Sequence, residues 1–246
     1  MNASYTFQHA NNFDNNGYYN IDPKVGYGPS NDYRNNVFIL TEVYQLPFGK
    51  GKKWGADAGR ALNFLIGGWS LNTATNFSSG LPFNYGLNSC SAEIDNGPCR
   101  PSMTTTAFDG TRSGSPTAGG YWFKTTSTSL EPSSTAKPGD PGAVCFGGAP
   151  LTGGNWVQPG CDSFGDTGRN PARGPKFFNI DLALFKNFNV TEKVYFQFQF
   201  QAFNVLNHVN LDLPNGCVDC TNGGSITNIA YGSQMRALQF GLKLNF

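Results

Sequence analysis

Residues 236–246 alternate apolar and polar side chains without interruption. One face carries Leu238, Phe240, Leu242, Leu244 and Phe246, and the other carries Ala237, Gln239, Gly241, Lys243 and Asn245. A period of two residues is that of a β-strand whose two faces meet different surroundings. A length of about 10 residues matches one pass of a tilted strand across a bilayer. We therefore expect a membrane-spanning strand at this end of the chain.

Further alternating segments precede it at residues 194–205, 177–188, 68–77 and 37–46, with the weakest candidate at 4–9. In 194–205, glutamines at 197, 199 and 201 lie opposite a row of phenylalanines. A soluble two-layer protein would bury the phenylalanines against a second sheet, whereas a barrel would expose them to lipid and turn the glutamines to a watery lumen. Three glutamines in register favour the barrel.

The same alternation assigns faces to the other segments. In 177–188 the apolar row is Phe178, Ile180, Leu182 and Leu184, so Asp181 faces inward. Lys186 has the apolar phase but lies near the strand end, where we expect its long side chain to reach the headgroups. Both faces of 37–46 are largely apolar, and Glu42 favours an outward direction for Val37, Ile39, Thr41 and Val43.

The lengths of the connections fit this architecture. With the carboxyl terminus in the periplasm, segments 11–33, 79–175 and 206–234 are external, and segments 47–66 and 189–193 are periplasmic. Outer-membrane barrels have short periplasmic turns and long outer loops, and only 47–66 is longer than expected. All six cysteines lie in the external segments. We thus predict an all-β fold, a segment of an antiparallel transmembrane β-barrel with about six meander strands.

Composition excludes several other classes. No segment approaches 18 consecutive apolar residues, which excludes transmembrane helices. The net charge of +1 gives no reason to expect nucleic acid as a partner. Residues 1–12 have neither a basic region nor an apolar core and so do not resemble a signal peptide. We therefore expect the chain to be the carboxyl-terminal piece of a longer protein.

The cysteines form three local pairs: Cys90 with Cys99, Cys145 with Cys161, and Cys217 with Cys220. In an oxidising compartment such pairs become disulfides that constrain loops. Only Cys217 and Cys220 have the spacing of zinc ligands, and no matching second pair accompanies them. We favour disulfides and expect no metal site.

The long segment 83–165 is rich in Gly, Ser, Thr and Pro and contains Tyr121, Trp122 and Trp156. One hypothesis is that these aromatic residues contact an extracellular ligand such as a glycan or peptide; an equally weighted alternative is that they pack the loop over the barrel mouth. The lysines at 50, 52 and 53 either contact anionic lipid or nucleic acid or belong to a solvated loop, which we favour. No catalytic arrangement stands out, so we expect neither an enzyme nor a cofactor.

Several ordered motifs carry a family resemblance: PFGKGKKW, LIGGWSLN, SGLPF, GRNPARGPKFFNIDLALFKNF and FQAFNVLNHVNL, followed by the final strand. Together they resemble the carboxyl-terminal region of TonB-dependent outer-membrane receptors, and more narrowly the Oar-like branch, whose members carry an amino-terminal carboxypeptidase-regulatory-like domain. The final Phe246, with Phe240, Leu242 and Leu244, resembles the signal that delivers such proteins to the barrel assembly machinery. The resemblance implies a barrel of about 22 strands around a plug, driven by TonB.

We accordingly expect residues 1–246 to form a partial barrel domain in the bacterial outer membrane, with 83–165 as a long extracellular insertion and without the plug and regulatory domains. The expected function is uptake of a bulky nutrient of the siderophore, glycan or peptide class, with membrane lipid, the plug domain and TonB as partners. Two alternatives remain open at this point. One is a small stand-alone or adhesin-like binding barrel, and the other is a secreted soluble β-sandwich that binds a ligand.

Overall fold

A computed structural model gives the fold of the chain. It describes residues 1–13, 24–87, 100–103, 121–123, 152–153, 156–157, 165–191 and 194–246. No helix in these ranges is long and apolar enough to cross a membrane.

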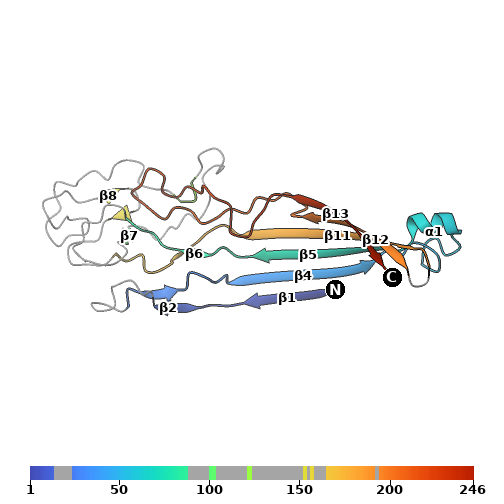
Figure 1. Cartoon of the computed structure of the whole chain (residues 1–246). Coiled ribbons are helices and arrows are strands. Elements are labelled where there is room, and N and C mark those ends of the chain that lie inside the picture. Colours follow the sequence, from blue (N-terminus) through green and yellow to red (C-terminus); the bar gives the residue numbers. More distant parts are fainter. Residues whose placement is uncertain are drawn as a thin grey trace, which may run out of the picture.

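The main element is a six-stranded antiparallel sheet with the order β1-β4-β5-β11-β12-β13 (Figure 1). Its strands are β1 (Asn2–Phe7), β4 (Asn36–Gln45), β5 (Trp69–Ser78), β11 (Phe177–Asn189), β12 (Tyr195–Phe203) and β13 (Ala237–Asn245). Each strand pairs with the next one of this set along the chain, which makes an up-and-down meander. The predicted strands and the all-β fold class are therefore confirmed.

Smaller elements lie at the two ends of this sheet. One end carries β2 (Asn11–Phe13), β3 (Tyr27–Pro29), β6 (Pro82–Phe83), β7 (Ser102–Met103), β8 (Thr152–Gly153), β9 (Trp156–Val157) and β10 (Ala172–Arg173). The other end carries α1 (Arg60–Ile66), as Figure 1 shows. We name these the outer end and the inner end, after the predicted external and periplasmic segments. The hydrophobic pattern of residues 60–66 did not predict α1.

The strand register separates an apolar face from a polar face. Phe200 lies opposite Leu184 on one side and Phe240 on the other, whereas Gln199 lies opposite Phe185 and Gly241. The polar face is linked by side-chain hydrogen bonds, such as the 2.8 Å bond from Gln199 Nε2 to Gln197 Oε1.

No helix or second sheet packs along this sheet, within the part of the chain that the structure describes (Figure 1). The side chains of Leu242 and Phe240 are 70% and 67% exposed. A soluble β-sandwich would bury these rows beneath a second sheet about 10 Å away. The open apolar face therefore argues against the sandwich alternative.

The expected phase of β4 is wrong. Its register with β5 places Leu40 opposite Thr75 and Glu42 opposite Thr73, on the apolar face, while Val37, Ile39, Thr41 and Val43 share the polar face. Glu42 Oε2 accepts a 3.1 Å hydrogen bond from Thr73 Oγ1. Because both faces of this strand are largely apolar, its own sequence does not define a phase, and pairing with β5 decides it.

The expectation for Lys186 is also wrong. Its side chain is 1% exposed instead of extending to the headgroups. Nζ donates a hydrogen bond to the carbonyl oxygen of Gly67 and lies 5.3 Å from the ring centroid of Trp69 and 5.2 Å from that of Phe188. The ammonium group is thus held by the chain itself, because the residues that follow α1 fold over it.

A first prediction tests which face meets lipid. Phe200→Lys should lower the free energy of unfolding in lipid vesicles by about 2–4 kcal/mol, since it places a cation in hydrocarbon. Gln199→Lys, one residue away on the polar face, is the matched control and should be nearly neutral. Equal losses for the two variants, measured by denaturant titration, would contradict the assignment of the faces.

Candidate functional site

The outer end contains a buried hydrophobic cluster built from segments distant in sequence. Its members are Phe83, Tyr85, Phe123, Trp156, Ala172 and Val218. The Tyr85 ring centroid lies 4.5 Å from that of Trp156 and 5.0 Å from that of Phe123. Burial raises the pKa of the Tyr85 hydroxyl above its usual range, so the group is neutral. The described parts of the external loops therefore share one packed core.

We call this cluster and the described loop segments around it the cap, and the predicted ligand-contact residues occupy different positions in it. Trp156 is only 5% exposed and belongs to the cluster. Trp122 packs against the cluster, and its Nε1 donates a 3.0 Å hydrogen bond to the carbonyl oxygen of Arg173. The side chain of Tyr121 is 38% exposed. Packing thus accounts for the positions of both tryptophans, while Tyr121 retains an accessible ring.

A polar hub, which we define as Arg169, Asn170 and Arg173, ties the neighbouring loops together. Arg169 Nη1 donates a 2.7 Å hydrogen bond to the carbonyl oxygen of Asn12. Asn170 Nδ2 donates one of 2.7 Å to the carbonyl oxygen of Pro29. Arg173 Nη2 donates one of 2.6 Å to the Tyr33 hydroxyl, above whose ring its guanidinium lies. The sequence pattern alone predicted no role for these residues, although they lie within one of the family-like motifs.

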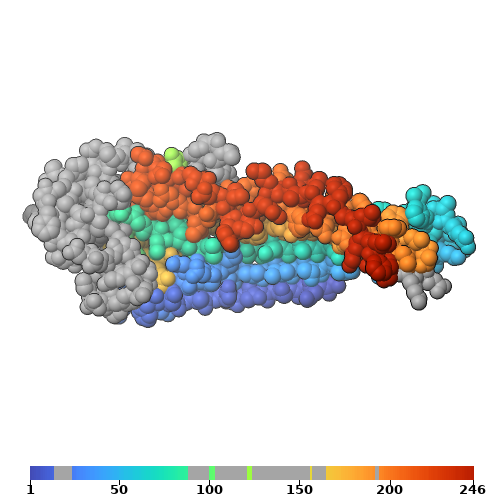
Figure 2. Space-filling view, viewed as in Figure 1, coloured from blue at the N-terminus to red at the C-terminus, as the bar shows by residue number. Residues whose placement is uncertain are grey.

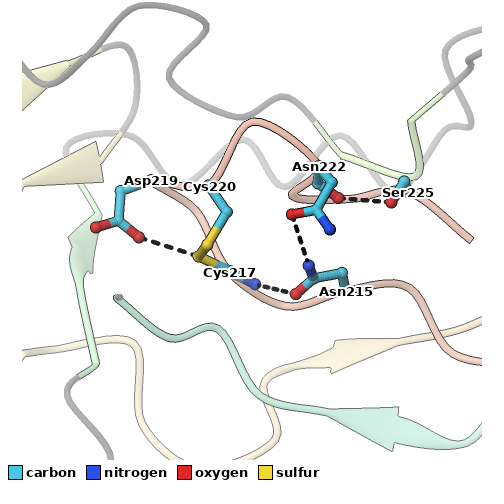
Figure 3. The surroundings of a disulfide bond; sticks show 6 residues. All are labelled: Asn215, Cys217, Asp219, Cys220, Asn222 and Ser225. Atoms are coloured by element: carbon cyan, nitrogen blue, oxygen red, sulfur yellow. Dashed lines mark hydrogen bonds between the residues drawn. A yellow bond between two sulfur atoms is a disulfide. The ribbon is translucent and has the colours of Figure 1, made fainter. Parts of the chain in front are cut away.

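A disulfide between Cys217 and Cys220 closes a tight loop beside the cluster (Figure 3). Between them Val218 is fully buried, and Asp219 Oδ1 lies 3.1 Å from Cys217 Sγ. Asn215 Oδ1 accepts a 3.1 Å hydrogen bond from the Cys217 backbone nitrogen. Both sulfurs are joined to each other and do not serve as thiolate ligands in this state. The predicted partners Cys90, Cys99, Cys145 and Cys161 lie outside the described residues.

A shallow groove of about 200 Å³ opens between the outer strand ends and the segment that precedes β13. Its lining residues are Arg34, Leu81, Pro175, Leu211, Asp212, Leu213, Ala230 and Tyr231. Arg34 Nη1 donates a 2.6 Å hydrogen bond to the carbonyl oxygen of Ser79, and burial lowers the pKa of its guanidinium. The groove offers apolar surface with one cation and one carboxylate, which suits a ligand with both apolar and polar parts.

Comparison with known families identifies the kind of domain to which the sheet belongs. The family model described as "Outer membrane beta barrel domain" matches residues 1–239. The chain belongs to this outer membrane beta barrel family. The barrel domain is accordingly located in the bacterial outer membrane, and the open apolar face of its sheet is the face that meets lipid. No curated protein and no solved structure matches the chain.

The end of the chain, from β13 to Phe246, carries the predicted assembly signal. Phe240, Leu242 and Leu244 project from the apolar face of β13, an end strand of the described sheet, and Phe246 is 96% exposed. These positions leave the terminal side chains accessible. Their recognition by the assembly machinery stays a prediction.

The polar hub yields a second prediction. Asn170 is 2% exposed and has a φ of 48°. Asn170→Ala should destabilise the outer end by about 2–4 kcal/mol, because it removes buried hydrogen bonds and places alanine in the left-handed region. Asn170→Gly removes the same hydrogen bonds but tolerates the positive φ, so it should recover about 1 kcal/mol of that loss. Limited proteolysis of the outer loops measures both, and wild-type resistance in both variants would contradict the role of the hub.

Proposed function

We propose that this chain is the carboxyl-terminal part of a TonB-dependent outer-membrane receptor of the Oar-like branch, which takes up a bulky nutrient. The observation that carries the proposal is the sheet itself, whose end strands β1 and β13 have no further strand partner among the described residues. An open sheet edge is not tolerated in hydrocarbon, because its backbone groups would lack hydrogen bonds. Six strands enclose too narrow a space for a plug, which favours one arc of a much larger barrel.

The polar face suits the lumen of such a receptor. It presents amide and carboxylate groups such as Gln197, Gln199 and Asp181, which can bind water or a polar plug surface. Asn179 Nδ2 donates a 2.9 Å hydrogen bond to Asp181 Oδ1. The ordered motifs shared with TonB-dependent receptors supply the remaining support. Together they favour an energised transporter over a small binding barrel.

The cap at the outer end suits capture of a nutrient before transport. Its buried cluster and polar hub fix the loops in place, and Tyr121 and the groove beside Arg34 remain accessible. Exposed aromatic rings stack on sugar rings and on peptide side chains, and a guanidinium pairs with carboxylates. We therefore place the nutrient contact at the outer end, with siderophores, glycans and peptides as the candidate classes.

Uptake by living cells tests the proposed function. Deletion of the gene should abolish uptake of one labelled nutrient class, and a protonophore should abolish uptake but leave surface binding intact, because TonB draws on the proton gradient. Separate measurement of the label inside the cells and on their surface distinguishes uptake from surface binding. Binding without energised uptake in the wild type would instead support the stand-alone binding barrel.

A further prediction separates contact with the nutrient from packing of the cap. Tyr121→Ala should lower nutrient binding about tenfold without changing the level of protein in the outer membrane, since it removes an exposed ring worth about 1–2 kcal/mol at an interface. Trp156→Ala should instead destabilise the cap by about 3–5 kcal/mol, because it opens a cavity in the cluster. Both are measured by equilibrium binding to cells and by protease resistance. Unchanged binding in Tyr121→Ala and in Trp122→Ala would leave packing as the role of these aromatic residues.

A further inference from the structure

The inner end carries an exposed surface that the transport proposal does not use. We define the inner-end turn as residues 47–67, from the end of β4 through α1. Figure 2 shows α1 projecting beyond the sheet at this end. Leu62, Phe64 and Leu65 of α1 are 51%, 54% and 65% exposed, and Trp54 is 51% exposed. Such a group of exposed apolar side chains marks an interaction surface.

Hydrogen bonds and a ring contact hold the inner-end turn in a defined conformation. The backbone nitrogen of Gly49 donates a 2.9 Å hydrogen bond to the carbonyl oxygen of Trp54, and the Phe48 and Trp54 rings stack at 5.1 Å. Asn63 Oδ1 of α1 accepts a 2.6 Å hydrogen bond from the Lys50 backbone nitrogen. Gly49 has a φ of +109°, and a Cβ there would lie 2.7 Å from Gly67 Cα. The turn and the helix therefore hold one another in a fixed shape.

The helix lies on the lipid side of the sheet. The Phe64 ring centroid is 4.9 Å from that of Phe188, which shares the apolar face with Phe196. Trp69, on the same face, donates a 3.0 Å hydrogen bond from Nε1 to the carbonyl oxygen of Leu65. Because these contacts are with the central strands β5 and β11, further strands at either sheet edge would leave this surface uncovered. The exposed side chains of α1 thus continue the lipid-facing surface past the strand ends.

The charge of the turn is strongly positive. It contains Lys50, Lys52, Lys53 and Arg60, against Asp57 as its one acidic residue. All four cationic residues are exposed, and Lys53 Nζ lies 5.2 Å from the Trp54 ring centroid. Cations beside exposed aromatic and aliphatic side chains, at the depth where strands leave the hydrocarbon, match an interfacial anchor for anionic headgroups.

We propose that the inner-end turn binds anionic phospholipids of the inner leaflet of the outer membrane. Leu62, Phe64 and Leu65 enter the acyl–headgroup boundary, and Lys52, Lys53 and Arg60 contact the phosphate groups. The solvated-loop interpretation of the three lysines, which the sequence alone favours, is replaced by this one because the structure places them beside an exposed apolar helix on the lipid side. The inference depends on membrane location and not on nutrient transport.

Photo-crosslinking in native outer membranes tests the contact. Benzoylphenylalanine is introduced in place of Leu65 in the protein as the cell assembles it, and adducts are identified by mass spectrometry after irradiation. Phospholipid adducts are expected at Leu65 and at Phe200, the positive control on the apolar face, but not at Gln199 on the polar face. Protein adducts at Leu65, or no lipid adduct where Phe200 gives one, would overturn the proposal.

A charge variant tests the preference for anionic headgroups. In the Leu65-labelled protein, Lys52→Gln with Lys53→Gln should lower the ratio of anionic to zwitterionic phospholipid among the adducts, by up to about fivefold per charge removed. Lys176→Gln with Arg236→Gln removes the same charge from exposed positions at the outer end and should leave the ratio unchanged. An unchanged ratio in the first pair, or an equal fall in both pairs, would overturn the assignment of the cations.

Discussion

Backbone hydrogen bonding between neighbouring strands is the constraint on which the rest of this structure depends. In hydrocarbon each N–H and C=O group needs a partner within the protein, so every spanning strand requires a neighbour on both sides. Among the described residues, the six antiparallel strands satisfy this requirement for one another except at the outer edges of β1 and β13. Register follows from the same pairing, because a shift of one residue would exchange the lipid-facing and polar rows throughout the sheet. The faces of the strands and the position of the termini both derive from this pairing.

The two ends of the sheet lie beyond the regular strand ladder and are organised differently from each other. At the outer end, loops from distant parts of the chain bury their aromatic rings against one another and are tied by the polar hub. At the inner end, the residues before α1 and the helix itself hold one another in place, but Leu62 and Leu65 remain exposed. The outer end is therefore organised as a folded cap, and the inner end as a surface continuous with the lipid-facing strands.

Buried polar side chains lie at both ends of the sheet, where the strands stop. Lys186 lies among the rings of Trp69 and Phe188 and donates to the Gly67 carbonyl oxygen, which keeps its charge away from lipid at the inner end. At the outer end, the side chain of Asn210 accepts a hydrogen bond from the Phe178 backbone nitrogen and donates one to the Phe178 carbonyl oxygen. In both cases a side chain supplies hydrogen bonds at a strand end, where the regular ladder stops.

The sequence by itself determined the strands, their order and the faces of β5, β11, β12 and β13, because in these segments strict alternation leaves a single phase. It did not determine the phase of β4, whose faces are both largely apolar. Nor did it determine the hydrogen bond of Lys186 to Gly67, whose position in sequence is 119 residues away. The cap and its polar hub were equally inaccessible, since their contacts join residues such as Asn12 and Arg169 that only the folded meander brings together. The periodicity of a strand follows from whether each of its faces meets lipid or water. Contacts between loops join residues that lie far apart in the sequence, so only the tertiary structure decides them.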